Sequence, residues 1–257
     1  MCGIITLFEK IDENNLSLWD KLSHRGTDSY GYASWDGKRI SIKKDLTPRR
    51  LKGKYKWSIL HNRKASVGKI TKTLAHPIEI DDKYYIIQNG TKKEIYYTHR
   101  LALSDTHGIG LIYKELKHKF KIFNYLDDTG VVFVIDKELK FIFFHKDESR
   151  SLYVNIDKKM LASEPIIEGT WQEINEENYI FTFDEFNFDN FIKTVELNKK
   201  KINIGKNELF KTLCDNCYKM KLCRRVNGRD ICPDCEYTGK NPVVKVYNHS
   251  VYGGWKW

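Results

Sequence analysis

The sequence MCGIITLF, residues 1–8, places a cysteine directly before a short apolar run. The run from Gly3 to Phe8 is partly β-branched, which predicts a buried strand. Removal of Met1 would make Cys2 the first residue, carrying both a thiol and a free α-amine. An α-amine has a pKa of about 7.7–8.0, so it can serve as a base that activates the adjacent thiol as a nucleophile. An early cysteine can equally be inert, so other residues must decide between the two interpretations.

Size and composition predict a soluble globular protein. A chain of 257 residues is long enough for one large domain and a small one. Hydrophobic residues make up 41% and charged residues 30%, which is typical of folded proteins. The longest apolar runs, at 84–87, 131–135 and 141–144, fall short of the ~18 residues of a membrane span. No signal-peptide pattern follows Met1, so we expect a cytoplasmic protein.

The net charge of +10 favours contact with polyanions such as nucleic acid. The chain is also rich in Lys, Ile and Asn, a composition that an AT-rich genome produces without a functional cause. Charge alone therefore does not separate a nucleic-acid-binding protein from an enzyme.

The hydrophobic pattern predicts runs of strands with few helices between them. The Asp36-Gly37 pair predicts a hairpin turn. Apolar residues at helical spacing predict one helix from Asn14 or Asn15 to Leu22 and another over 106–118. We expect strands at 3–8, 31–35, 39–42, 57–60, 84–88, 131–135, 141–144, 152–155 and 179–182. This order favours an α+β fold with packed sheets over a repeated βαβ unit.

Two cysteine pairs near the C-terminus predict a structural zinc site. Cys214 and Cys217 form one CxxC knuckle, and Cys232 and Cys235 form the second. Tetrahedral zinc is bound by four thiolates in two such pairs, and the tight-turn signal at Asn227-Gly228 would bring the pairs together. Cys223 is expected to be a spare thiol, with ligation in place of one of the four as the alternative.

The cysteine region also combines basic and aromatic residues. Such a surface can hold single-stranded nucleic acid by charge and stacking, or it can be a solvated ribbon whose tail packs on the rest of the protein. We favour a protein-contact or structural role. The residues are Lys219, Lys221, Arg224, Arg225, Arg229, Tyr247, Tyr252, Trp255 and Trp257.

Composition divides the chain into four expected segments. Residues 1–183 form the main domain, and 184–212, with three phenylalanines followed by several lysines, form a linker or an extension over it. Residues 213–240 form the zinc ribbon, and 241–257 form an aromatic tail.

An ordered set of short motifs accompanies Cys2. They are His24-Arg25-Gly26-Thr27-Asp28, His61-Asn62-Arg63-Lys64-Ala65-Ser66, Ala75-His76-Pro77, Gln88-Asn89-Gly90, Ser104-Asp105-Thr106, Gly130 and Ala162-Ser163-Glu164-Pro165. In this order and spacing, residues 2–183 resemble the class II glutamine amidotransferase domain, a member of the N-terminal nucleophile hydrolases. The resemblance implies an αββα sandwich, followed here by a small zinc-ribbon domain.

The resemblance also implies roles in catalysis. Cys2 is expected to attack the side-chain amide of glutamine, release ammonia and form a γ-glutamyl thioester that water hydrolyses to glutamate. Asn89 and Gly90 are expected to form the oxyanion hole.

Further residues are expected to hold the substrate. Arg63 would bind the α-carboxylate of glutamine, because a guanidinium fork matches that group, and Asp105 would bind the α-ammonium group. Ser66 retains a hydroxyl that the family usually supplies from Thr, and Arg25 would support the region around the nucleophile. Histidines 24, 61 and 76 are expected to be packing or turn residues, because an α-amine can serve as the base.

Besides Ser66, three residues depart from the family pattern. Lys64 stands where the family usually has Trp, Val67 where it has His, and Gln88 where it has His. These changes leave the core chemistry in place and bear on affinity and specificity. No phosphate-binding glycine-rich loop is present, so ammonia is expected to pass to a partner synthetase, or else the reaction stops at hydrolysis.

Two alternatives remain. The protein could hydrolyse a different γ-glutamyl amide, with the departures from the family pattern admitting another leaving group. It could also be a degenerate scaffold whose ribbon binds nucleic acid or protein.

Overall fold

The computed structural model describes residues 2–8, 15–49, 51, 53–204, 210–213, 220–226 and 229–231. The chain forms two compact units, Met1–Lys206 and Asn207–Trp257. Each unit is described by itself below.

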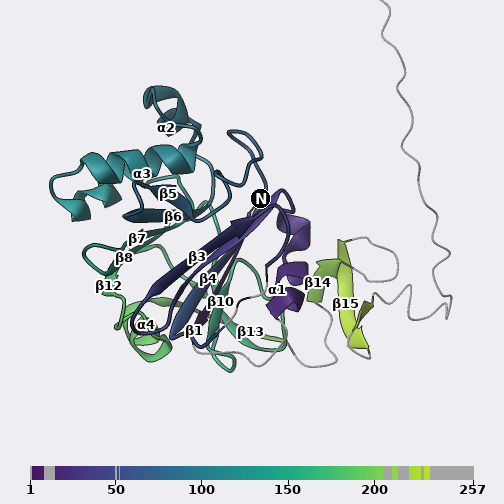
Figure 1. Ribbon diagram of the computed structural model, residues 1–257. Coiled ribbons are helices and arrows are strands. Elements are labelled where there is room, and N and C mark those ends of the chain that lie inside the picture. Colours follow the sequence, from purple (N-terminus) through teal and green to yellow (C-terminus); the bar gives the residue numbers. More distant parts are fainter. Residues whose placement is uncertain are drawn as a thin grey trace, which may run out of the picture. The chain divides into compact units, whose positions relative to one another are not determined.

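The first unit is built on two antiparallel sheets (Figure 1). The larger has eight strands in the order β13 (Leu197–Ile204), β11 (Gly169–Ile174), β9 (Tyr153–Asn155), β10 (Met160–Ala162), β1 (Gly3–Phe8), β4 (Trp57–Arg63), β2 (Ser29–Trp35) and β3 (Ile40–Asp45). The smaller has five strands in the order β12 (Glu177–Thr182), β8 (Phe141–Lys146), β7 (Val131–Asp136), β6 (Tyr84–Asn89) and β5 (Ile78–Ile80).

Four α-helices accompany these sheets in the described part of the unit. They are α1 (Asn15–Lys21), α2 (Lys93–Thr98), α3 (Asp105–Glu115) and α4 (Phe188–Thr194). Two 3-10 segments cover Ser23–Arg25 and Lys119–Tyr125. Helix α3 lies over β5 and β6 (Figure 1).

The side chains of the apolar run in β1 point alternately to the two faces of the larger sheet, and both faces are buried. Ile4 and Phe8 point into a core shared by the two sheets, whereas Ile5 and Leu7 point to the opposite face, where they pack with Trp19 and its neighbours in α1. Successive side chains of a strand face opposite sides, so a strand buried on both faces is apolar throughout. The Gly3–Phe8 strand is therefore as the sequence predicts.

The three apolar cores give the first unit four layers. The central core contains Trp57 of the larger sheet and Phe133 and Phe144 of the smaller one. The core on the other face of the smaller sheet joins β-strand residues to Ile109 and Tyr113 of α3. The layers run α1, larger sheet, smaller sheet, α3. The α+β prediction with packed antiparallel sheets is confirmed.

Residues 184–204 belong to the first unit. Phe186 and Phe191 are fully buried in the central core, α4 supplies Phe188, and β13 pairs with β11 at the edge of the larger sheet. The sequence boundary at 183 rested on the polar residues around these phenylalanines, and the first unit extends to Lys206.

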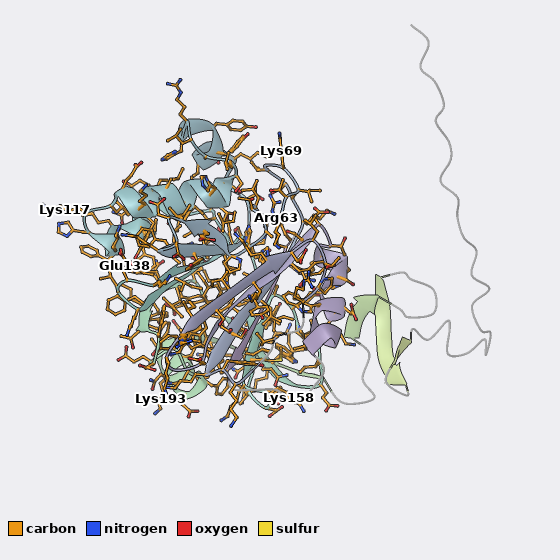
Figure 2. All side chains as sticks on the ribbon, in the orientation of Figure 1. Arg63, Lys69, Lys117, Glu138, Lys158 and Lys193 are labelled. Carbon is orange, nitrogen blue, oxygen red and sulfur yellow. The ribbon has the colours of Figure 1, made fainter. Side chains whose placement is uncertain are left out.

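Figure 2 shows Lys69, Lys117, Lys158 and Lys193 at separate places around the first unit, while Arg63 lies further inside. None of the helices among the described residues has the length and apolar character needed to cross a bilayer.

The second unit contains a three-stranded antiparallel sheet. Its strands are β14 (Phe210–Leu213), β15 (Met220–Val226) and β16 (Arg229–Ile231), with β15 in the centre. The four predicted zinc ligands, Cys214, Cys217, Cys232 and Cys235, lie outside the described residues, as does the 241–257 tail. Among the residues that are described, no group of three or more His, Cys, Asp or Glu side chains is suited to a metal ion.

Candidate active site

Strand β1 fixes the position of Cys2 in the middle of the larger sheet. It pairs with β10 on one side and β4 on the other, with Gly3 opposite Asn62. The Arg25 Nε–H donates to the carbonyl of Cys2 at 2.9 Å, and the Ile4 N–H donates to Ser163 Oγ at 2.9 Å. Hydrogen bonds on both sides of the peptide thus hold the backbone around the thiol, which is 8% exposed.

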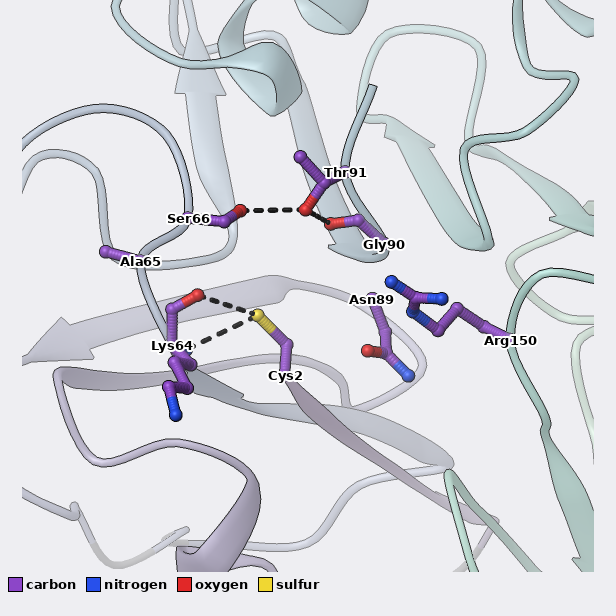
Figure 3. Close-up of a pocket in the computed structure, with 8 residues that line it drawn as sticks. All are labelled: Cys2, Lys64, Ala65, Ser66, Asn89, Gly90, Thr91 and Arg150. Atoms are coloured by element: carbon purple, nitrogen blue, oxygen red, sulfur yellow. Dashed lines mark hydrogen bonds between the residues drawn. The ribbon is translucent and has the colours of Figure 1, made fainter. Parts of the chain in front are cut away.

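The Cys2 thiol contacts the backbone at the end of β4. Its Sγ lies 3.4 Å from the Lys64 nitrogen and 3.5 Å from the Lys64 carbonyl oxygen (Figure 3). Burial raises the pKa of the Cys2 thiol, and the Lys64 N–H and the charge of Arg63 act in the opposite direction without cancelling it. A thiol with a raised pKa is a poor nucleophile at neutral pH unless a base removes its proton.

Asn89 ends strand β6 beside Cys2 and is fully buried. Its Nδ2 lies 3.1 Å from Ser163 Oγ, while its Oδ1 is buried and has no hydrogen-bond partner. Figure 3 shows this oxygen on the side of the amide that faces Cys2.

Rotating the Asn89 amide by 180° exchanges its two polar atoms without changing its shape. Ser163 Oγ then accepts from the Ile4 N–H and donates to Asn89 Oδ1, which satisfies both residues. The Nδ2 group then faces Cys2 as a donor. The hydrogen-bond pattern therefore favours an amide donor directed at the nucleophile.

Gly90 follows Asn89 at a place where only glycine fits. A Cβ on Gly90 would lie 1.8 Å from the Thr129 carbonyl oxygen. Gly130, opposite, has a φ of +87°, and a Cβ there would lie 2.3 Å from the Asn89 carbonyl oxygen. Two backbones therefore meet closely beside Cys2, and this contact holds the Asn89-Gly90 turn in place.

Arg63 ends strand β4 with its side chain buried. Nη1 donates to the Lys69 carbonyl and Nη2 to the Val67 carbonyl, each at 2.9 Å. Burial lowers the pKa of Arg63, although a guanidinium stays charged in proteins. The two hydrogen bonds use part of the fork and leave other N–H donors for a ligand.

Asp105 begins helix α3 and faces the same cavity as Arg63. Ser104 Oγ caps the helix by accepting from the His107 N–H at 3.1 Å. Asp105 Oδ2 accepts from the Lys92 N–H at 3.0 Å. Burial raises the pKa of Asp105, against the effect of these backbone donors and of Arg63.

Two overlapping cavities join these residues. Cys2, Lys64, Ser66 and Gly90 line both. The smaller has a volume of about 10 Å³ and is also lined by Arg63 and Asp105 with Val67, His76, Gln88 and Thr106. The larger has a volume of about 360 Å³ and is also lined by Ala65, Asn89, Thr91 and Arg150.

A hydroxyl contact crosses the cavities. Ser66 Oγ and Thr91 Oγ1 lie 2.7 Å apart and join the segment after β4 to the segment after β6 (Figure 3). The volume of the smaller cavity corresponds to about one water, so a larger ligand requires these walls to separate.

Buried polar residues support the floor of the site. His61 and His76 stack with ring centroids 4.0 Å apart. His61 Nε2 donates to the Gln88 carbonyl at 2.9 Å, and His76 Nδ1 accepts from the Gln88 N–H at 3.1 Å. Burial lowers the pKa of His61 to about 3 and lowers that of His76 as well. Both rings are therefore neutral, as expected for packing histidines.

The Gln88 side chain ties two parts of the site together. Its Nε2 donates to the Thr129 carbonyl at 3.0 Å, and its Oε1 accepts from Thr106 Oγ1 at 2.6 Å. Thr129 precedes Gly130, and Thr106 follows Asp105. Gln88 thus links the Gly90 contact to the helix that carries Asp105.

Arg25 lies behind the nucleophile and not in either cavity. Its Nη1 donates to Glu164 Oε2 at 3.0 Å, and the other carboxylate oxygen lies 2.5 Å from His24 Nε2. Burial acts to raise the pKa of Glu164, but His24 and Arg25 outweigh it and the pKa is lowered. The ionised carboxylate holds Arg25 toward the Cys2 carbonyl.

Of the seven residues predicted for catalysis and substrate binding, six lie on the cavity walls: Cys2, Arg63, Ser66, Asn89, Gly90 and Asp105. Neither Ser163 nor Arg150 was predicted from the sequence to have a role. Ser163 lies in a quoted motif, which was the available signal. Arg150 lies in no motif, and only the fold brings it near Cys2.

Comparisons by sequence found no matching family model and no matching curated protein. Comparison of structures found glutamine phosphoribosylpyrophosphate amidotransferase from B. subtilis complexed with ADP and GMP, at 17% identity and a TM-score of 0.47 over 71% of this chain and 49% of that chain. A structure of the allosteric regulatory enzyme of purine biosynthesis gave 17% identity and a TM-score of 0.48 over 71% of this chain and 49% of that chain. The crystal structure of a predicted glutamine amidotransferase from Pseudomonas aeruginosa PA01 gave 14% identity and a TM-score of 0.40 over 77% of this chain and 95% of that chain. The matched part of the first two amounts to about half their length, and likenesses of this degree assign no function.

Proposed function

We propose that this protein is a class II glutamine amidotransferase of the N-terminal nucleophile type, which hydrolyses the side-chain amide of glutamine. The observation that carries the proposal is the convergence of Cys2, the Asn89-Gly90 turn and the Arg63–Asp105 pair on two overlapping cavities. The four layers, with Cys2 directly before a central strand, agree with an αββα sandwich of that type.

The proposed reaction starts with removal of Met1. The freed α-amine of Cys2 takes the thiol proton, which the buried thiol does not readily lose alone. The thiolate adds to the γ-carbonyl carbon of glutamine, and the oxyanion receives hydrogen bonds from Asn89 Nδ2 and the Gly90 N–H. The protonated amine returns its proton to the nitrogen as the C–N bond breaks. Water then adds to the thioester, and glutamate leaves.

Specificity for the free amino acid comes from the charged pair. The Arg63 guanidinium has donors left for the α-carboxylate, and Asp105 offers a carboxylate to the α-ammonium group. Ser66 lines the same space and would bind the substrate through its hydroxyl. Arg25 acts through the Cys2 carbonyl and holds the nucleophile in position.

We further propose that a partner synthetase accepts the ammonia.

We also propose a structural zinc ion held by Cys214, Cys217, Cys232 and Cys235. The paired CxxC spacing supports the zinc site, and β15 and β16 lie between the two pairs in the sequence. Mass spectrometry under native conditions tests this site. One zinc per chain is expected, and a metal-free folded chain would contradict the assignment.

The hydrolytic activity is tested by measuring ammonia and glutamate formed from glutamine. The wild-type chain without Met1 is expected to release both in equal amounts. Cys2→Ala is expected to abolish the release. A Cys2→Ala protein as active as the wild type would overturn the proposal.

A further inference from the structure

The larger cavity beside Cys2 is more spacious than the departure of ammonia requires. Its volume is about 360 Å³, whereas a cavity of about 10–15 Å³ by the same measure holds one water molecule, which is similar in size to ammonia. Arg63 and Asp105 line only the smaller cavity. If these two residues hold the amino-acid end of the substrate, the larger cavity accommodates whatever is attached to the γ-nitrogen.

Arg150 lines the larger cavity from the loop after β8. Figure 3 shows its side chain reaching from that loop toward Asn89 and Gly90. Its stem passes close to Gly130, where an added Cβ would lie 2.7 Å from Arg150 Cγ. The tight Gly90–Gly130 contact therefore also places Arg150 near the nucleophile.

The Arg150 guanidinium has unused hydrogen-bond donors. Nη1 donates to the Ser149 carbonyl at 2.5 Å, and the buried Nε has no hydrogen-bond partner. None of the ion pairs among the described residues includes Arg150. A guanidinium with this surplus of donors and no counter-charge is suited to an anionic ligand.

The other walls of this cavity are compatible with an anion. Ala65, Ser66 and Thr91 are neutral, and no Asp or Glu is among the lining residues. Lys64 also lines the cavity, but Figure 3 shows its side chain directed away from Cys2. Arg150 is therefore the cation placed to meet a ligand here.

We propose that the larger cavity binds the amine portion of a γ-glutamyl amide that carries a carboxylate, and that Arg150 binds this carboxylate. This inference rests on the proposed function, because it assigns the γ-glutamyl group to Arg63 and Asp105. It makes the substrate class wider than glutamine, whose amide nitrogen carries only hydrogen.

The reaction on such a substrate follows the same steps as the reaction on glutamine. Cys2 sulfur bonds to the γ-carbonyl carbon, and the C–N bond breaks. The leaving nitrogen takes the proton held by the α-amine of Cys2 and departs as an amine. Water then cleaves the thioester, so that one γ-glutamyl amide and one water give glutamate and the free amine.

Matched pairs of substrates test the proposal. The pairs are γ-glutamylglycine, γ-glutamyl-β-alanine and γ-glutamyl-4-aminobutyrate, each compared with the same compound bearing a carboxamide in place of the carboxylate. For at least one arm length, wild-type kcat/KM is expected to be ten times or more higher for the carboxylate member. A ratio near one for all three pairs, with glutamine still hydrolysed, would overturn the inference and leave the proposed function standing.

The variant Arg150→Gln assigns the effect to one residue. The carboxylate-to-carboxamide ratio is expected to fall to about one, whereas the exposed Arg100→Gln is expected to keep the wild-type ratio and the glutamine rate. An unchanged ratio in Arg150→Gln would exclude Arg150 as the binding residue. If neither glutamine nor any γ-glutamyl amide is hydrolysed by a chain that begins at Cys2, the proposed function itself fails.

Discussion

The Asn89 side-chain amide and Ser163 Oγ lie 3.1 Å apart, and the same Ser163 oxygen accepts the Ile4 N–H at 2.9 Å. One hydroxyl thus connects the strand that presents Cys2 to the amide expected to stabilise the oxyanion. The distance between nucleophile and oxyanion donor is therefore set by a side chain that lines neither of the two cavities.

Ser163→Ala is expected to lower kcat about 10- to 100-fold with a small change in KM. The Asn89 amide loses the partner that orients it, and removing an oxyanion donor entirely costs about 100- to 1,000-fold. Steady-state kinetics with glutamine measures the effect. The control is Ser58→Ala, a buried serine in β4 whose hydroxyl donates to the Ala33 carbonyl. Equal losses in both variants would argue for a general packing effect.

Asp105→Asn is expected to lower kcat/KM for glutamine about 10- to 100-fold. A hydrogen bond to a charged group contributes about 1.5–3 kcal/mol, and the neutral amide gives up the attraction for the α-ammonium group. Glutaramic acid, which is glutamine without its α-amine, is expected to be hydrolysed equally by both proteins. The control is Glu115→Gln at the other end of α3, which is expected to behave like the wild type. The same penalty on both substrates would place Asp105 outside amine recognition.

Gly90→Ala is expected to be inactive and less stable by about 1–3 kcal/mol, the usual cost of overpacking. The new methyl would meet the Thr129 carbonyl oxygen at 1.8 Å. Urea unfolding measures the stability. Gly53→Asn provides the control, because no atom lies within 4 Å of a Cβ at Gly53 and Asn tolerates its φ of +88°. A fully active Gly90→Ala protein would rule out the tight turn as part of the site.

Acid is expected to destabilise the fold through the stacked histidines. The pKa of His61 is about 3 in the folded chain against 6.5 for an unperturbed histidine, so only the unfolded chain takes up the proton between these values. Stability is therefore full above about pH 6.5 and falls as the pH drops toward 3.

The size of this effect can be measured by urea unfolding at pH 7 and pH 5. Between these values His61 alone accounts for a loss of about 2 kcal/mol, and His61→Gln is expected to lose that much less than the wild type. His118→Gln, at an exposed position, is the control. An identical loss in wild type and His61→Gln would mean that His61 is protonated in the folded chain.

Much of the fold could be predicted from local patterns. Short apolar runs located strands such as β1, β7 and β8, because strands buried on both faces carry nearly continuous apolar runs. The three-residue strands β5 and β10 were missed, since their few residues carry no period. The α4 and β13 region was assigned to a linker or an extension over the main domain because its phenylalanines alternate with Asp and Asn, and only the folded core shows that these phenylalanines are interior.

The sequence predicted those residues of the candidate site that lie in short, ordered motifs. Short motifs mark positions at the ends of strands and helices: Cys2 directly precedes β1, Arg63 and Asn89 end strands, Gly90 follows β6, and Asp105 begins α3. Arg150 follows a strand that is distant in sequence and joins the site through contact with Gly130. Such a residue has no sequence signal, because its role depends on which segments the sheets bring together.

The central claim is that Cys2 is an N-terminal nucleophile for glutamine. Its most direct test is peptide mass spectrometry of the native full-length protein after treatment with a diazoketone analogue of glutamine. One adduct per chain is expected, on Cys2, in a peptide that lacks Met1, and excess glutamine is expected to slow its formation. Chains that lack Met1 but remain unlabelled at Cys2, or that are labelled at the same rate with and without glutamine, would contradict the claim.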